Sequence, residues 1–104
     1  MINSMKITKI KYYDLGEHKN PNFLGRCSVV IEDTLMLNNI MILSGNGGDY
    51  IVMPSKRRIC DDLNKEEEDI FYPVDRRYFS YMRDTVLEGF EICKNNNKYV
   101  YRPK

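Results

Sequence analysis

Six basic residues, arranged in two groups along the chain, are the side chains best suited to bind phosphate. They are Lys56, Arg57, Arg58, Arg76, Arg77 and Arg83. Two tyrosines, Tyr78 and Tyr81, interleave with the second group. Guanidinium groups beside aromatic rings suit contact with phosphates and stacking on bases. This pattern favours nucleic-acid binding, and the alternative is a helix face that is simply solvated.

The remaining candidates for reactive chemistry have simpler explanations. His18, the only histidine, is expected to be a solvated loop residue, because no nucleophile is placed to pair with it. The cysteines Cys27, Cys60 and Cys93 lack the paired spacing of a zinc site and are expected to be free thiols, buried or half-buried. With no nucleophile–base pair and no metal-ligand set, the sequence indicates a protein that is not an enzyme and has no cofactor.

Two further segments superficially suggest ligand sites. Gly45-Asn46-Gly47-Gly48 lacks the lysine and hydroxyl residue of a Walker loop, and it predicts a hairpin turn because Asn-Gly supplies positive φ angles. The acidic residues between positions 61 and 69 lack the alternating ligands and the glycine of an EF-hand. A solvated acidic loop is therefore expected there.

Composition sets the broad class of the protein. The chain has 104 residues, 42% of them hydrophobic and 30% charged, which indicates a single folded domain. A net charge of +1 excludes a protein that is basic overall, so any attraction for nucleic acid must be local. No apolar run approaches the length of a membrane span, and the first ten residues lack the apolar centre of a signal peptide. The expected location is the cytoplasm.

The first two thirds of the chain predicts strands. Residues 5–13 alternate apolar and polar with a shift in register near Thr8 and Lys9, and residues 23–32 place Cys27, Val29 and Ile31 on one face. A tight turn at Glu32-Asp33 leads to a third strand, and a fourth is stopped by Pro54. Residues 57–68 are expected to form a surface loop, and residues 70–72 a short strand.

From Arg76 the apolar period becomes that of a helix, with Asp75 placed as its N-cap. The predicted buried stripe consists of Phe79, Met82, Val86, Phe90 and Cys93. Asn95-Asn96-Asn97 ends the helix. The fold class is therefore α+β: a twisted antiparallel sheet of four to five strands followed by a C-terminal amphipathic helix. One domain is expected over 1–94, with a basic and aromatic tail over 95–104.

Two blocks of sequence carry a resemblance to a known family. Residues 42–57 contain Met53-Pro54-Ser55-Lys56-Arg57 after a glycine turn, and Asp69-Ile70-Phe71-Tyr72-Pro73-Val74 forms the second block. Over about residues 5–92 the chain resembles the stage V sporulation protein G (SpoVG, septation protein) family. It departs from the family's pattern in three ways. Tyr72 stands where a histidine is usual, the linker Arg58–Glu68 is acidic and longer, and the helix has Phe79 and Tyr81 where basic residues are common.

The resemblance implies a small cytoplasmic bacterial regulator that forms a homodimer and binds DNA, RNA or both, connected to sporulation and septation. The six basic residues named above would then form the nucleic-acid-binding site. The alternative is a non-catalytic protein-interaction adaptor of the division or sporulation machinery, which would use sheet edges or the acidic loop. In neither case is a membrane expected to be a partner.

Overall fold

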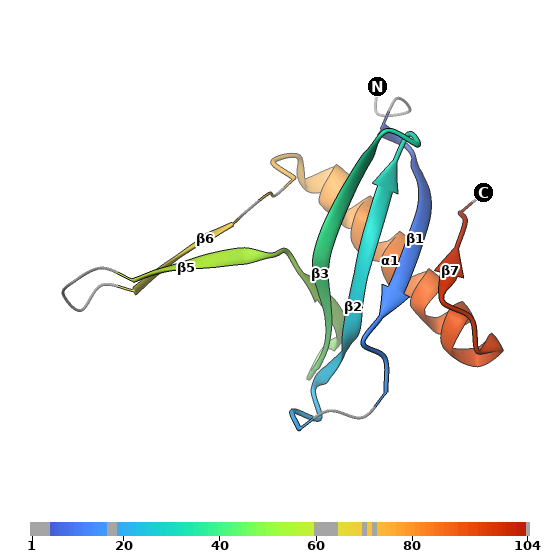
Figure 1. Cartoon of the computed structure of the whole chain (residues 1–104), viewed down its shortest axis with the longest axis horizontal. Helices are drawn as coiled ribbons and strands as arrows, with labels where there is room; N and C mark the ends of the chain where they lie inside the picture. The colour runs from blue at the N-terminus through green and yellow to red at the C-terminus, as the bar shows by residue number, and fades with distance from the viewer. Residues whose placement is uncertain (1–4, 17–18, 60–64, 70, 72, 104) are drawn as a thin grey trace.

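An antiparallel sheet with one helix on its back forms the body of the protein (Figure 1). The computed structural model describes residues 5–16, 19–59, 65–69, 71 and 73–103, with 55–59 and 65–69 as backbone alone. The elements in chain order are β1 (Ile7–Tyr13), β2 (Phe23–Ile31), β3 (Leu35–Gly45), β4 (Gly48–Val52), β5 (Ser55–Ile59), β6 (Lys65–Asp69), α1 (Arg76–Asn96) and β7 (Val100–Tyr101). The sheet has the order β4-β3-β2-β1-β7, which confirms the predicted α+β class.

The turns between the strands follow from their residues. Glu32 and Asp33 both have positive φ, and the Thr34 N–H donates to the Ile31 carbonyl at 2.9 Å, which closes the predicted tight turn. The glycine-rich segment is the predicted hairpin, with Gly45 paired with Gly48. Its positive φ, +117°, falls on Gly48, a conformation that glycine adopts without steric cost.

The core lies between the sheet and α1. Ile7, Ile10, Cys27, Val29 and Ile40 are completely buried there. The shift expected near Thr8 is confirmed, because the pairing of β1 with β2 breaks register between Ile7 and Lys9. Alternation about this bulge directs the apolar side chains to the helix, so that one face of the sheet is covered and the other is open (Figure 1).

The predicted helix is present, and its buried stripe differs at one position. Met82, Val86, Phe90 and Cys93 are buried as expected, but Phe79 is only half-buried. Tyr78 takes the buried place instead, at 8% exposure. Its hydroxyl donates to the Met5 carbonyl at 2.7 Å, a contact with the segment before β1. This partner satisfies the tyrosine hydroxyl, so burial does not leave a polar group unpaired.

Both ends of α1 are capped where the sequence predicted, by a side chain at the first end and by the backbone at the second. Asp75 is extended and its carboxylate accepts from the Arg77 N–H at 2.8 Å. Asn97 is left-handed, with φ of 55°, and its N–H returns to the Cys93 carbonyl. The segment after the helix contains β7, which pairs with β1 at Ile10 and Lys11 and adds the fifth strand.

The surface loop predicted over residues 57–68 is wrong for most of its length. Ser55–Ile59 and Lys65–Asp69 pair as an antiparallel ribbon, and residues 60–64 lie outside the described part of the chain. The ribbon projects from the body as an arm (Figure 1). Of the short strand expected over residues 70–72, positions 70 and 72 likewise lie outside the described residues. Phe71, between them, packs against the core. In the described part of the chain, no helix is both long and apolar enough to cross a membrane.

Candidate nucleic-acid interface

The six basic residues lie on two elements. Lys56, Arg57 and Arg58 belong to β5 of the projecting ribbon, and Arg76, Arg77 and Arg83 belong to α1. The chain passes from the end of β6 to the first residue of α1 through residues 70–75. The ribbon and the beginning of the helix are therefore close along the chain.

The first turn of α1 exposes two arginines. The side chain of Arg77 is 84% exposed, and its Nε lies 3.7 Å from the Asp75 carboxylate. The N-capping hydrogen bond from the Arg77 N–H, with a smaller contribution from the arginine charge, lowers the pKa of Asp75 below its ordinary value of 3.8. No acidic residue lies in this turn of the helix itself. The turn therefore concentrates positive charge where the helix dipole is also positive, an arrangement that suits an anion.

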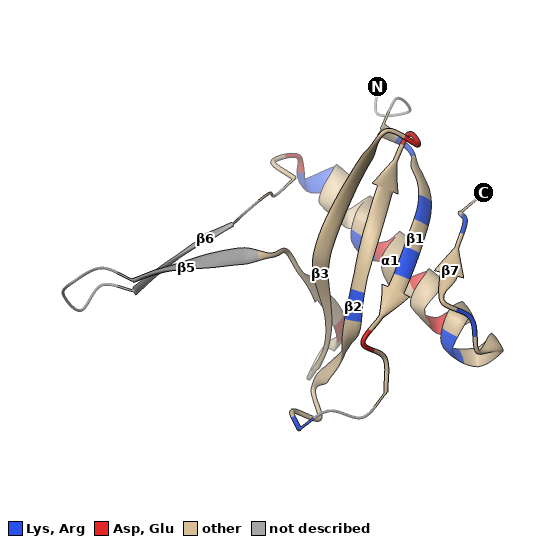
Figure 2. Ribbon diagram, viewed as in Figure 1, with Lys and Arg blue, Asp and Glu red and all other residues tan. Residues whose placement is uncertain are grey.

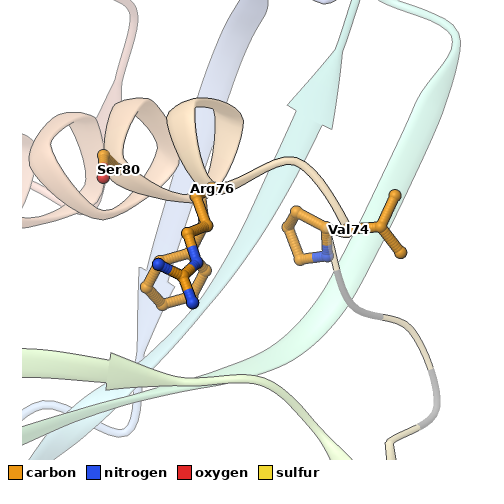
Figure 3. A pocket seen from close by; sticks show the side chains of 5 residues that line it. Val74, Arg76 and Ser80 are labelled. Atoms are coloured by element: carbon orange, nitrogen blue, oxygen red, sulfur yellow. The ribbon is translucent and has the colours of Figure 1, made fainter.

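Arg76 lines a cavity of about 570 Å³ beside the same turn, together with Pro73, Val74, Phe79 and Ser80. Figure 3 shows Arg76 extending from the beginning of α1, with Ser80 further along the helix and Val74 on the preceding segment. A guanidinium in an open, largely apolar hollow can contact a phosphate while flat apolar groups remain nearby.

Arg83 and the two interleaved tyrosines contribute less than the sequence indicated. The side chain of Arg83 is 42% exposed, and its Nε is 3.1 Å from the carboxylate of Asp84. This acidic neighbour partly neutralises the positive charge of Arg83. Tyr78 is buried and cannot stack on a base. Tyr81 is partly exposed, but its hydroxyl accepts the Ile7 N–H at 2.9 Å. The predicted stacking role is therefore wrong for Tyr78, because its ring is buried in the core and its hydroxyl donates to the Met5 carbonyl.

The ribbon places the basic triplet opposite an acidic one. In its register Lys56 faces Glu68, Arg57 faces Glu67, and Arg58 faces Glu66. The two strands together carry no net charge. The sequence showed both runs but not that they would be aligned.

Of the other groups considered from the sequence, Cys27 and Cys93 are buried free thiols, as predicted. Burial raises the pKa of Cys27 to about 12 and also raises that of Cys93, so neither is a nucleophile at neutral pH. His18 and Cys60 lie outside the described residues. Among the described residues, no three histidine, cysteine or acidic side chains are grouped to hold a metal.

Two lysines that sequence reasoning did not assign to a site lie on the open face of the sheet. Lys9 and Lys11 alternate along β1 with the buried Ile10 and Tyr12. Figure 2 shows basic residues along β1 and on β2, with acidic residues at the ends of these strands. The period-two pattern of residues 5–13 was the available signal, because it separates the lysines from the core side chains.

The chain is similar to known proteins over most of its length. The SpoVG family model matches residues 5–92. A relative from Borrelia hermsii named "Putative septation protein SpoVG" is 29% identical over 94 residues, covering 88% of this chain and 91% of the relative. A protein of the same name from Caldanaerobacter subterraneus is 26% identical over 93 residues, covering 89% and 96% respectively. In Desulforudis audaxviator the identity is 31% over 64 residues, covering 62% and 68%.

Proposed function

Because the chain belongs to the SpoVG family, we propose that it is a nucleic-acid-binding regulator of gene expression in the bacterial cytoplasm, connected to septation or sporulation. The observation that supports binding most directly is the first turn of α1. Arg76 and Arg77 are exposed there, at the positive end of the helix dipole, with no acidic residue in the turn itself. Such a turn binds phosphate oxygens rather than base edges.

Binding through these residues is expected to depend on salt more than on sequence. Neither asparagine nor glutamine flanks the arginines in the first helical turn, and these are the side chains that read adenine. Lys56, Arg57 and Arg58 extend the site along the ribbon, but the two strands of the ribbon together carry no net charge. Arg76 and Arg77 should therefore contribute more to affinity than the ribbon does.

The experiment compares wild-type protein with Arg76→Gln/Arg77→Gln, using a 20-base-pair DNA duplex and a single-stranded RNA at several salt concentrations. Each lost phosphate contact on duplex DNA lowers the salt slope by about 0.9, so two contacts correspond to about a 60-fold loss of affinity at 0.1 M salt. Removing cations from a helix N-terminus favours the helix, so unfolding would not explain the loss. Lys19→Gln/Lys94→Gln makes the same change in net charge on exposed residues elsewhere and serves as the control.

We further propose that the functional unit is a homodimer. β4 and β7 are the edge strands of the sheet, and β7 pairs with β1 at only two positions. Exposed sheet edges favour pairing with another chain, and symmetric dimers are the commonest oligomers. Sedimentation equilibrium should show twice the 12.3 kDa mass of the chain at micromolar concentration. A monomer alone at that concentration would contradict the dimer.

A protein-interaction adaptor is the second candidate, and the ribbon is the observation that favours it. The ribbon projects from the body and carries no net charge, which suits a polar protein surface better than a phosphate chain. If the wild-type protein binds neither nucleic acid at 0.05 M salt, the adaptor replaces the regulator as the proposed function.

A further inference from the structure

The face of the sheet that α1 does not cover is the largest surface that the proposed site leaves unused. It is identified by register, because the residues that alternate with the buried core must point the other way. Six of them on β1, β2 and β3 are Lys9, Lys11, Arg26, Ser28, Val30 and Met41. Lys11 is exposed and Lys9, Arg26 and Met41 are half-buried, whereas Ser28 and Val30 on the central strand are buried. Lys11 pairs with Ser28, Lys9 with Val30, and Arg26 with Met41, so they form one continuous area, here called the open face.

The open face is positively charged because of its composition and its ion pairs. β1, β2 and β3 contain no aspartate or glutamate anywhere between their described ends. Arg26 forms an ion pair with Asp14, just beyond the end of β1. Neither Lys9 nor Lys11 forms an ion pair with any residue that the structure describes. The uncompensated charge is therefore a row of two lysines along β1 (Figure 2).

Beside this row the open face is partly aromatic and internally hydrogen-bonded. The Arg26 guanidinium lies 4.9 Å from the centre of the Phe23 ring. The Ser28 hydroxyl donates to the Asn38 side chain at 2.7 Å, and the Tyr13 hydroxyl donates to the Asn39 side chain at 3.1 Å. These polar groups are held by one another beside the half-buried rings of Tyr13 and Phe23. Such a surface suits unstacked bases, which offer both a flat face and polar edges.

We propose that the open face binds single-stranded nucleic acid, with phosphates along Lys9 and Lys11 and bases lying toward Arg26 and Met41. The charge complementarity identifies the ligand as an anionic chain. A second copy of the same face would instead set lysines against lysines or apolar groups. A duplex keeps its bases stacked inside, so only a single strand can place its bases on this face. The inference rests on the proposed nucleic-acid binding, but it concerns a different surface from the first turn of α1.

The experiment measures binding of a fluorescent 15-nucleotide oligothymidylate and of a 20-base-pair duplex by anisotropy between 0.05 and 0.3 M salt. Four proteins are compared: wild type, Lys9→Gln/Lys11→Gln, Arg76→Gln/Arg77→Gln, and the control Lys19→Gln/Lys94→Gln. Each phosphate contact with a single strand contributes about 0.7 to the salt slope, so losing both lysines should weaken oligothymidylate binding about 25-fold at 0.1 M salt. Duplex binding should change less than about threefold, as in the control.

The outcomes separate this inference from the proposed function. Selective loss of single-strand affinity in Lys9→Gln/Lys11→Gln supports the inference. Oligothymidylate binding that matches the control in affinity and slope would overturn it and leave the proposed function intact. If the wild type binds neither ligand, both fail. Because a misfolded variant could imitate a loss, amide chemical-shift changes in the wild type with oligothymidylate provide a second readout. The largest changes should lie in β1 and β2, and changes confined to α1 would overturn the inference.

Discussion

Replacing Gly89 by alanine should destabilise the protein, although the same change in an ordinary helix stabilises it by about 1 kcal/mol. Gly89 lies inside α1, beside the side chains of Tyr12 on β1 and Tyr101 on β7. A methyl group added there would lie 2.4 Å from the Tyr12 hydroxyl oxygen and 2.4 Å from Cδ2 of Tyr101. Contacts this short do not occur between real side chains, so at least one tyrosine must move by about 1 Å to restore ordinary van der Waals contact.

Neither tyrosine can move without a loss. The Tyr12 ring is 3% exposed, and its hydroxyl donates to the Val86 carbonyl at 2.7 Å. The Tyr101 hydroxyl donates to Glu88 at 2.7 Å. Overpacking a core typically costs about 1–3 kcal/mol, and a buried hydroxyl that loses its partner costs about 1–3 kcal/mol more. After subtracting the gain in helix propensity, the expected net loss is about 3 kcal/mol, or roughly 15 °C in Tm for a domain of this size.

Urea unfolding followed by circular dichroism measures this change, and a double-mutant cycle tests its cause. In a Tyr101→Ala background the ring that meets the new methyl is absent, so Gly89→Ala should cost at least about 1 kcal/mol less than in the wild type, within the usual range of coupling between neighbours. A Gly89→Ala protein at least as stable as the wild type would refute the argument. An equal cost in both backgrounds would show that Tyr101 is not the obstacle.

Three further outcomes follow from local geometry. Gly48→Val should lower stability by about 1–3 kcal/mol through backbone strain at φ of +117°, and not through a clash, because nothing lies within 4 Å of the new Cβ. Gly47→Val, at ordinary φ, is the control and should cost clearly less in the same melting assay. Burial raises the pKa of Tyr78 to about 12, so the stability that its neutral hydroxyl contributes is complete below pH 10 and is lost as the pH rises toward 12. Tyr78→Phe should therefore flatten the alkaline limb of a stability–pH profile, and an unchanged limb would contradict this. The hydrogen bond from the Arg77 N–H is the main reason that the pKa of Asp75 is lowered, so the stability contributed by this charged cap is present above pH 3.8 and is lost below it. Asp75→Ala should lower Tm at pH 7 and have little effect at pH 2, and equal losses of Tm at the two pH values would disprove the charged cap.

The features that the sequence predicted are those determined by local pattern. The break in alternation at Thr8 appeared as a bulge between Ile7 and Lys9, because a strand with one face in the core must realign its apolar residues. Asp75 and Asn97 define the ends of α1 through their own side chains and backbone. In each case the deciding interaction lies within a few residues of the position.

The features that the sequence did not predict depend on partners distant in the chain. Tyr78 and Phe79 lie next to each other on the margin of the apolar stripe, and the Met5 carbonyl, 73 residues from Tyr78, decides which of them is buried. The ribbon of β5 and β6 has no apolar alternation, so only its register shows that its basic and acidic runs match. β7 has two residues, too few for any periodicity. The same limit applied in part to the open face: the pattern of β1 shows its two lysines, but the lack of acidic partners on β2 and β3 becomes visible only when the three strands are aligned.

The distribution of acidic residues limits how much nucleic acid the open face can hold. Asp14 lies beyond one end of β1, and Glu32 and Asp33 form the turn at the far end of β2, so a phosphate chain along the lysines meets repulsion at both ends. Lys9 and Lys11 are about 7 Å apart along the strand, which is enough for only a few nucleotides. With a net charge of +1, little long-range attraction adds to these contacts. A single protomer should therefore bind a short single strand weakly, and the proposed dimer would raise affinity for longer strands by linking two such faces through one ligand.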